Sequence, residues 1–119
     1  MSSELPRKPR VLLLSRDFEL GLLRQRVLQQ AGCEVLFPED GAEALRVLKA
    51  DNLDVMVVAH TISRESGGYY SRIFRENNPQ GRIVYVCSST IEHPPEWADE
   101  NVLGLAGPEE LVAAVLRKS

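Results

Sequence analysis

The sequence lacks the usual marks of a membrane protein, an exported protein or a nucleic-acid-binding protein. Its apolar runs, such as VLLL and VMVVA, are very short, whereas a helix needs about 20 apolar residues to cross a bilayer. The first residues, MSSELPRKPR, contain no apolar core of a secretion signal. Lys and Arg number 14 against 17 for Asp and Glu, so the basic surplus of a nucleic-acid-binding surface is missing. We expect a cytoplasmic protein that binds neither membranes nor nucleic acids.

Cysteine is scarce, since only Cys33 and Cys87 are present. The pattern described below places one at the beginning of a strand and the other at the end of a parallel strand. Five residues of strand separate such positions by about 15 Å, at about 3.3 Å per residue. A disulfide requires Cα atoms within about 7 Å. We therefore expect two free thiols that pack as small apolar side chains in a reducing compartment.

Residues arranged for catalysis or for metal binding are also lacking. No serine has a histidine and an acid in a known triad arrangement, and no paired carboxylates end a strand. His93 has no second ligand at metal-binding spacing. We expect no enzyme activity, no metal and no cofactor.

The chain does contain enough apolar sequence for one folded domain. It has 119 residues, of which 44% are hydrophobic and 26% charged, close to the average for globular domains. Residues 1–9 are polar and twice interrupted by proline, so we expect a flexible arm there. Residues 10–119 then form a single domain.

From Val11 onward, short apolar runs alternate with longer stretches of helical period, which is typical of βα units around a buried parallel sheet. Strands are predicted at residues 11–14, 34–37, 55–59, 83–87 and 102–105. Asp17 is expected to cap the first helix, which Gly32 ends. Its predicted buried face contains Phe18, Leu22, Leu23, Val27 and Leu28.

The stretch SSTIEHPPEWADEN, residues 88–101, breaks this regularity. Two adjacent prolines leave room for only a turn or two of helix, from about Pro95 to Glu100. The fourth helix is therefore predicted to be shortened. The last helix begins at Pro108, with two acids in its first turn. The pattern as a whole predicts a three-layer α/β fold whose binding crevice lies at the carboxyl ends of the strands.

Several motifs resemble the receiver domain of bacterial response regulators. The stretch EDGAEALRVLKADNLDVMVVA is similar to that family's second helix and third strand, and RVLLLSRD, NPQGRIVYVCSS and LAGPEELVAAVL follow the family's order. The resemblance covers about residues 9–118. It implies a flavodoxin-like (βα)5 fold, a doubly wound parallel sheet of order 2-1-3-4-5.

Receivers hold Mg²⁺ with two acids after the first strand and an aspartate that ends the third, and that aspartate accepts the phosphoryl group. The resemblance places these carboxylates on Ser15, Arg16 and Ala59. It places the family's hydroxyl residue on Cys87, followed by Ser88, and its lysine on Gly107, followed by Pro108. The charge of the site thereby changes from about −2 to about +1, which removes the attraction for a dication.

The neighbouring residues do not replace the missing carboxylates. Asp17 is expected to serve as the helix cap, and strand alternation points His60 away from the site. The sequence therefore resembles a pseudoreceiver, a receiver that is not phosphorylated and that acts in signalling as an interaction or scaffolding module. Two alternatives remain open, namely residual atypical phosphotransfer and binding of a small anion by Arg16, Ser88 and Ser89.

A partner face is predicted from the same resemblance. In receivers the fourth helix, fifth strand and fifth helix commonly mediate dimerisation or output. The partner is expected to be another signalling protein or a second copy of this chain. Trp97 is a candidate anchor, because tryptophan is enriched at interface hot spots, and simple packing of its ring over the sheet edge is the alternative. The predicted face contains Glu96, Trp97, Leu103 and Leu105.

Overall fold

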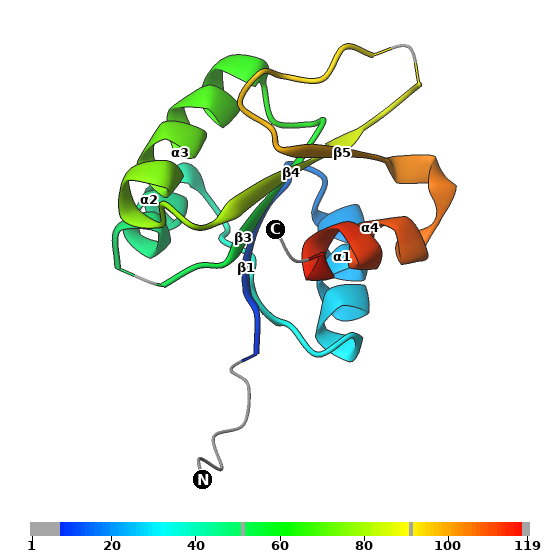
Figure 1. Ribbon diagram of the computed structural model, residues 1–119, viewed down its shortest axis with the longest axis horizontal. Helices are drawn as coiled ribbons and strands as arrows, with labels where there is room; N and C mark the ends of the chain where they lie inside the picture. Colours follow the sequence, from blue (N-terminus) through cyan, green and yellow to red (C-terminus); the bar gives the residue numbers. More distant parts are fainter. Residues whose placement is uncertain (1–7, 51, 91, 118–119) are drawn as a thin grey trace, which may run out of the picture.

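Five parallel strands form one central sheet, and helices cover both of its faces (Figure 1). The computed structural model describes residues 8–50, 52–90 and 92–117. The strands are β1 (Arg10–Leu14), β2 (Glu34–Leu36), β3 (Val55–Ala59), β4 (Arg82–Cys87) and β5 (Glu100–Leu103). The helices are α1 (Phe18–Gln30), α2 (Gly41–Ala50), α3 (Arg64–Asn77) and α4 (Pro108–Leu116), with a short 3-10 helix, η1 (Gly104–Ala106), before α4.

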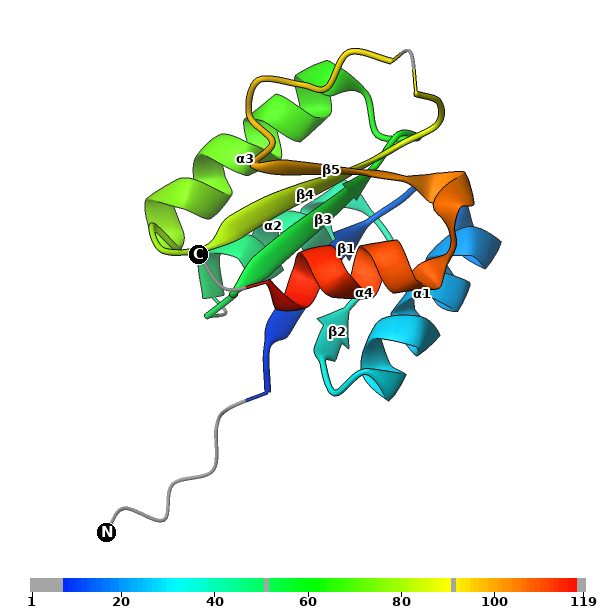
Figure 2. The same cartoon turned by 45° about the vertical axis from the view of Figure 1, so that its right-hand side comes forward.

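The strand order is β2-β1-β3-β4-β5. Leu12 in β1 lies opposite Leu36 on one side and Met56 on the other. Helices α1 and α4 lie side by side on one face of the sheet, and α2 and α3 cover the other face (Figures 1 and 2). These observations confirm the predicted flavodoxin-like fold, and the bounds of β3 agree with the prediction.

Two separate cores result from the alternation of side chains along the strands. Val11, Leu13, Val57 and Val84 point to the face that α1 and α4 cover. Leu12, Met56, Val58 and Ile83 point to the face that α2 and α3 cover. Because both faces are covered, β3 is apolar at every position, which explains why it reads as a continuous apolar run.

The buried face of α1 differs from the prediction. Phe18 is 63% exposed and Leu23 is 56% exposed. Leu28 is buried as predicted, and the other buried residue of the helix is Gly21, which was not predicted. A Cβ added to Gly21 would lie 2.1 Å from the ring of Phe37, so the helix sits close to the residue that follows β2. This close approach rotates the apolar residues Phe18, Leu22 and Leu23 toward solvent.

The shortening predicted for the fourth helix is confirmed, but the turn or two of helix expected from about Pro95 to Glu100 does not form. In the described residues between β4 and β5, the chain makes only turns and bends. One turn is closed by the amide of Ala98, which donates to the carbonyl of Pro95 at 3.2 Å. Pro94 and Pro95 each disfavour the helical conformation in the residue before them, so a helix cannot extend through this stretch. Glu100, predicted as the helix end, is the first residue of β5.

The fifth strand begins and ends earlier than predicted, and it stops at Leu103 rather than at Leu105. Cys87 and Leu103 are its last paired positions with β4. Leu105 lies beyond the sheet in η1, and 88% of its surface is exposed. In the sequence LGLA, Leu103 therefore ends the strand, and Leu105 exposes an apolar side chain to solvent.

The remaining predictions concern the chain ends, the thiols and the membrane. Residues 1–7 of the predicted arm lie outside the described residues, whereas the carbonyl of Pro9 accepts a hydrogen bond from the amide of Glu34 at 2.8 Å.

Cys33 and Cys87 are free thiols, and burial raises the pKa of Cys33. None of the helices in the described part of the chain is long and apolar enough to span a bilayer.

Candidate functional site

The crevice at the carboxyl ends of the strands begins with the turn after β1. The Oγ atom of Ser15 accepts a hydrogen bond from the amide of Asp17 at 3.1 Å. The amide of Arg16 donates to Oγ1 of Thr61, beyond β3, at 2.9 Å. The carboxylate of Asp17 accepts from the amide of Leu20 at 3.0 Å. Asp17 is thus the cap of α1, as predicted, and the turn is tied to the neighbouring loop.

Ala59 ends β3 and is fully buried. Its side chain is a methyl group, which can neither coordinate a cation nor accept a phosphoryl group. His60, the next residue, is exposed. Within the described ranges, no group of three or more His, Cys, Asp or Glu side chains could hold a metal ion.

Glu92 forms a polar cluster at the end of β4 that the sequence analysis did not identify. Its carboxylate accepts from the amide and the hydroxyl of Ser88, at 2.8 and 3.0 Å. The hydroxyl of Tyr85 also donates to it, and the guanidinium of Arg64 lies 3.8 Å away. Arg64 in turn donates to the carbonyl of His93. These contacts join β4, α3 and the loop that replaces the fourth helix.

The ionisation of this cluster follows from its contacts. The hydrogen bond from Tyr85, together with those from Ser88, lowers the pKa of Glu92. Burial, and then the hydrogen bond to Glu92, raises the pKa of Tyr85 to about 12. At neutral pH the cluster is therefore a charged carboxylate held by neutral hydroxyl groups. No spacing in the stretch IEHPPEW indicates this role, because it depends on how the loop folds back.

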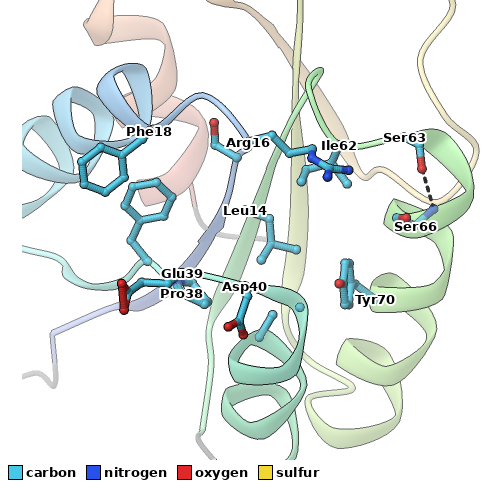
Figure 3. A pocket seen from close by; sticks show the side chains of 14 residues that line it. Leu14, Arg16, Phe18, Pro38, Glu39, Asp40, Ile62, Ser63, Ser66 and Tyr70 are labelled. Carbon is cyan, nitrogen blue, oxygen red and sulfur yellow. Dashed lines mark hydrogen bonds between the residues drawn. The ribbon is translucent and has the colours of Figure 1, made fainter.

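A cavity of about 520 Å³ lies beside the turn after β1, among the carboxyl ends of β1 and β2 and the beginnings of α2 and α3. Arg16 and Tyr70 line it, and Figure 3 shows the guanidinium of Arg16 reaching toward Ile62. Ser88 and Ser89 are not among its lining residues, so this cavity contains Arg16 without the two serines of the predicted anion-binding set. Glu39 and Asp40 add two carboxylates to the lining, so the cavity lacks the positive surplus that a simple anion prefers.

Several solved structures share this fold. A response regulator from Burkholderia pseudomallei, crystallised with a phosphorylated aspartic acid, a calcium ion and citrate, has a TM-score of 0.76 and 19% identity over 91% of this chain. A response regulator receiver protein from Sinorhizobium medicae has a TM-score of 0.75 and 26% identity, with 91% of each chain covered. The complex of the histidine kinase ThkA with the response regulator TrrA of Thermotoga maritima contains a chain with a TM-score of 0.69 and 23% identity, over 92% of this chain and 99% of that one.

This chain has the receiver fold. It spans 66% of the length of the Burkholderia pseudomallei protein. No protein-family model matches the sequence, and no curated protein matches it at a significant level. The likeness therefore lies in the arrangement of the strands and helices.

The end of β5 is arranged differently from the expectation for a receiver lysine at Gly107. Gly104 directly follows β5, and η1 separates the strand from Gly107. Gly107 has a φ of +107° and precedes Pro108, the first residue of α4. A positive φ suits glycine because it carries no Cβ. Pro108 therefore starts the last helix, as predicted, and Gly107 is the turn before that helix.

The predicted partner face of the receiver fold is partly occupied by internal contacts. Trp97 is half-buried, and its ring meets Tyr85 edge-on with centroids 5.8 Å apart. Its Nε1 atom donates to the carbonyl of Arg64 at 3.3 Å. A Cβ added to Gly67 would lie 2.4 Å from the tryptophan ring. Trp97 thus packs over the sheet and α3, in agreement with the alternative prediction for this residue.

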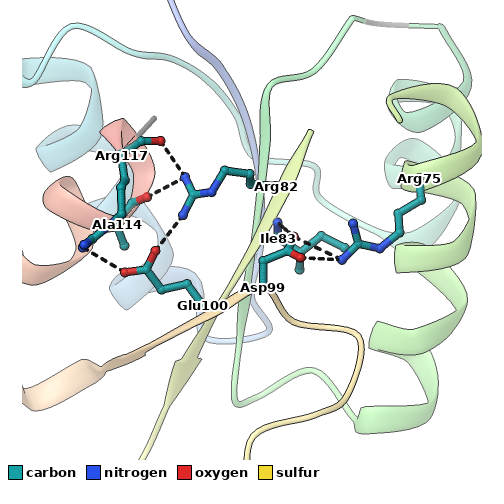
Figure 4. Close-up of polar contacts among 7 residues, drawn as sticks. All are labelled: Arg75, Arg82, Ile83, Asp99, Glu100, Ala114 and Arg117. Atoms are coloured by element: carbon teal, nitrogen blue, oxygen red, sulfur yellow. Dashed lines mark hydrogen bonds and ion pairs between the residues drawn. The ribbon is translucent and has the colours of Figure 1, made fainter. Parts of the chain in front are cut away.

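The other residues of the predicted face differ in exposure. Glu96 and Leu105 are exposed, whereas Leu103 is half-buried. The opposite end of β5 is fixed to α4 by an ionic network, shown in Figure 4. Arg82 lies 2.6 Å from a carboxylate oxygen of Glu100 and donates to the carbonyl of Ala114 at 2.9 Å. Leu105 is therefore exposed in η1, which connects a strand and a helix that are held together.

Proposed function

We propose that this chain is a receiver-like domain that accepts no phosphoryl group and acts by binding another protein of a two-component-type signalling pathway in the bacterial cytoplasm. The observation that carries the proposal is the buried methyl group of Ala59 at the end of β3. Phosphoryl transfer to a receiver requires a carboxylate at that position and a metal ion beside it.

The surroundings of Ala59 support the same conclusion. Ser15 and Arg16 stand where two acids would hold Mg²⁺, and Arg16 contributes a positive charge. The one carboxylate of this turn, on Asp17, is hydrogen-bonded to the first turn of α1. A single capped carboxylate is a poor Mg²⁺ site, because magnesium in phosphoryl-transfer sites needs one or two free carboxylates and the substrate phosphate.

The binding role is supported by the fold and by one exposed side chain. TrrA, which shares the fold, is crystallised in complex with a histidine kinase. Leu105 exposes 88% of its surface directly after β5, in the region through which receivers commonly dimerise. An exposed leucine beside a rigid strand fits the apolar centre of a protein interface. The partner is another signalling protein or a second copy of this chain, and the domain itself catalyses no reaction.

Addition of Mg²⁺ and beryllofluoride, which together mimic an aspartyl phosphate, is expected to leave the amide NMR spectrum unchanged. The diagnostic amides are those of Ser15, Arg16, Ala59, His60 and Ser88. No change is expected because the site has no carboxylate to bond to beryllium and no acid pair to hold the metal. TrrA, whose crystal structure contains Mg²⁺ and BeF, is the positive control in the same buffer. Saturable shifts at these amides would contradict the proposal and indicate residual phosphotransfer chemistry.

Substitution of Leu105→Asp is expected to weaken self-association of the domain by at least about tenfold. A charge placed in the apolar centre of an interface must be desolvated without a partner. Sedimentation equilibrium of the native and variant proteins measures the effect, and Glu76→Ala, at an exposed position of α3 outside this face, is the control. Leu105 is exposed, so the variant keeps the native fold by circular dichroism. A native protein that stays monomeric at all concentrations would rule out the homodimer and leave a different protein as the partner.

A further inference from the structure

A narrow groove lies between α1 and α4, above the carboxyl ends of β4 and β5. The two helices lie side by side on this face of the sheet in both views (Figures 1 and 2). The groove has a volume of about 200 Å³ and a mostly apolar surface. It lies on the face of the sheet away from the cavity in Figure 3, and the two share no lining residue. Its walls include Leu23, Arg24, Val27, Gly104, Gly107 and Leu111.

Arg24 is the one charged residue in this lining. Its side chain is half-buried, and burial lowers the pKa of its guanidinium, an effect that the charge of Asp17 partly offsets. Among the described residues, no hydrogen bond or ion pair satisfies this guanidinium. A partly desolvated guanidinium without a direct hydrogen bond costs free energy, which the more distant charge of Asp17 offsets only in part. An anionic group brought into the groove would offset that cost.

Gly104 makes the space in which the guanidinium lies. A Cβ at this position would be 3.2 Å from Nη2 of Arg24, 3.3 Å from Val86 and 3.4 Å from the carbonyl of Cys87. The absence of a side chain at this position therefore leaves room for the guanidinium, which a Cβ would force to shift by a few tenths of an ångström. The Oε1 atom of Glu109 in α4 lies beside Gly107 at the rim, and Glu109 forms no ion pair with Arg24.

We propose that the groove binds a short aliphatic monocarboxylate. Its carboxylate pairs with Arg24, and its alkyl chain lies against Leu23, Val27 and Leu111. Guanidinium and carboxylate groups match in a planar, two-point geometry. The alkyl chain of the ligand must be short, because the volume of the groove is below the range typical of sites for drug-sized ligands, about 300–1,000 Å³.

Titration with hexanoate, followed by amide NMR, tests this site. We expect saturable shifts at Gly104, Gly107 and the residues of α1 that line the groove. Hexanamide has nearly the same shape and no charge, so it is expected to bind at least about tenfold more weakly, because it loses a charge-assisted hydrogen bond. Acetate, which has the charge without the alkyl chain, is expected to bind weakly as well.

Two variants separate a specific site from general attraction to the domain. Arg24→Met keeps the apolar stem, so it is expected to weaken hexanoate binding at least about tenfold while hexanamide binding stays the same. Arg26→Met, on the exposed side of the same helix, is expected to leave both unchanged. The melting temperature of Arg24→Met confirms that it folds, and it is expected to rise because an unpaired, half-buried charge is removed. Absence of saturable shifts, equal affinity for hexanamide, or hexanoate binding unaffected by Arg24→Met would each overturn the proposal.

Discussion

Trp97→Ala is expected to lower the free energy of unfolding by about 2–3 kcal/mol, somewhat less than for a fully buried tryptophan. The substitution removes the edge-on contact with Tyr85, the hydrogen bond to Arg64 and the cover over Gly67. Urea denaturation followed by circular dichroism measures the change, since Trp97 is the only tryptophan and its fluorescence is lost with it.

A double-mutant cycle with Gly67→Ala shows whether this contact is the cause. Alone, Gly67→Ala is expected to cost about 1–3 kcal/mol, because the added methyl group collides with the indole ring. In the Trp97→Ala background the same change is expected to be neutral or stabilising, since alanine is the better helix former. A decrease in the free energy of unfolding below about 1 kcal/mol for Trp97→Ala, with no coupling to Gly67, would contradict the packing described above. It would favour the prediction that Trp97 belongs to the partner face.

The stability of the domain is expected to fall by about 2–3 kcal/mol between about pH 10 and about pH 12 through the ionisation of Tyr85 alone. The fold raises the pKa of this phenol to about 12, from an ordinary value of about 10. The folded state thus favours the protonated form. Its contribution is fully present below the unfolded pKa and is lost as the pH rises through the folded pKa. Ultraviolet absorbance of tyrosinate and denaturation at a series of pH values measure it.

Tyr85→Phe is the matched control, because it keeps the ring and removes the ionisation. Its stability is expected to be lower at neutral pH, where Glu92 loses a donor, and to vary less at alkaline pH. Glu92 acts in the opposite direction at acid pH. Its pKa is lowered by folding, so its contribution is present above its ordinary pKa and disappears as the pH falls through the folded pKa. An alkaline transition unchanged by Tyr85→Phe would contradict this account.

Much of the fold could be predicted from the sequence because local and global preferences agree in the sheet. The run Val55–Ala59 is apolar throughout, as both faces of its strand are covered, and its bounds were predicted correctly. The error in α1 has a physical cause. Several rotations of the helix about its own axis would bury some of its apolar residues. The close approach of Gly21 to Phe37 selects one of these rotations. A helical period alone does not contain that tertiary contact.

The candidate site could be predicted only where a residue's role depends on its position along a strand. The positions of Ser15, Arg16, Asp17 and Ala59 at strand ends follow from the order of the elements. The role of Glu92 depends on a loop without periodicity, and the role of Arg24 depends on the phase of α1. Once the orientation of α1 is known, a charged residue on its inward side indicates a candidate binding site, because buried charges are rare unless they have a partner.

The contact between Gly67 and Trp97 also has a consequence for the ancestry of this chain. The indole ring occupies the volume that any side chain at position 67 would need, so neither residue can be exchanged freely while the other is kept. In related sequences the two positions are therefore expected to change together, with a smaller residue at position 97 wherever position 67 carries a side chain. Such paired changes would trace the descent of this variant of the fold even where overall identity has fallen too low for an alignment to be trusted.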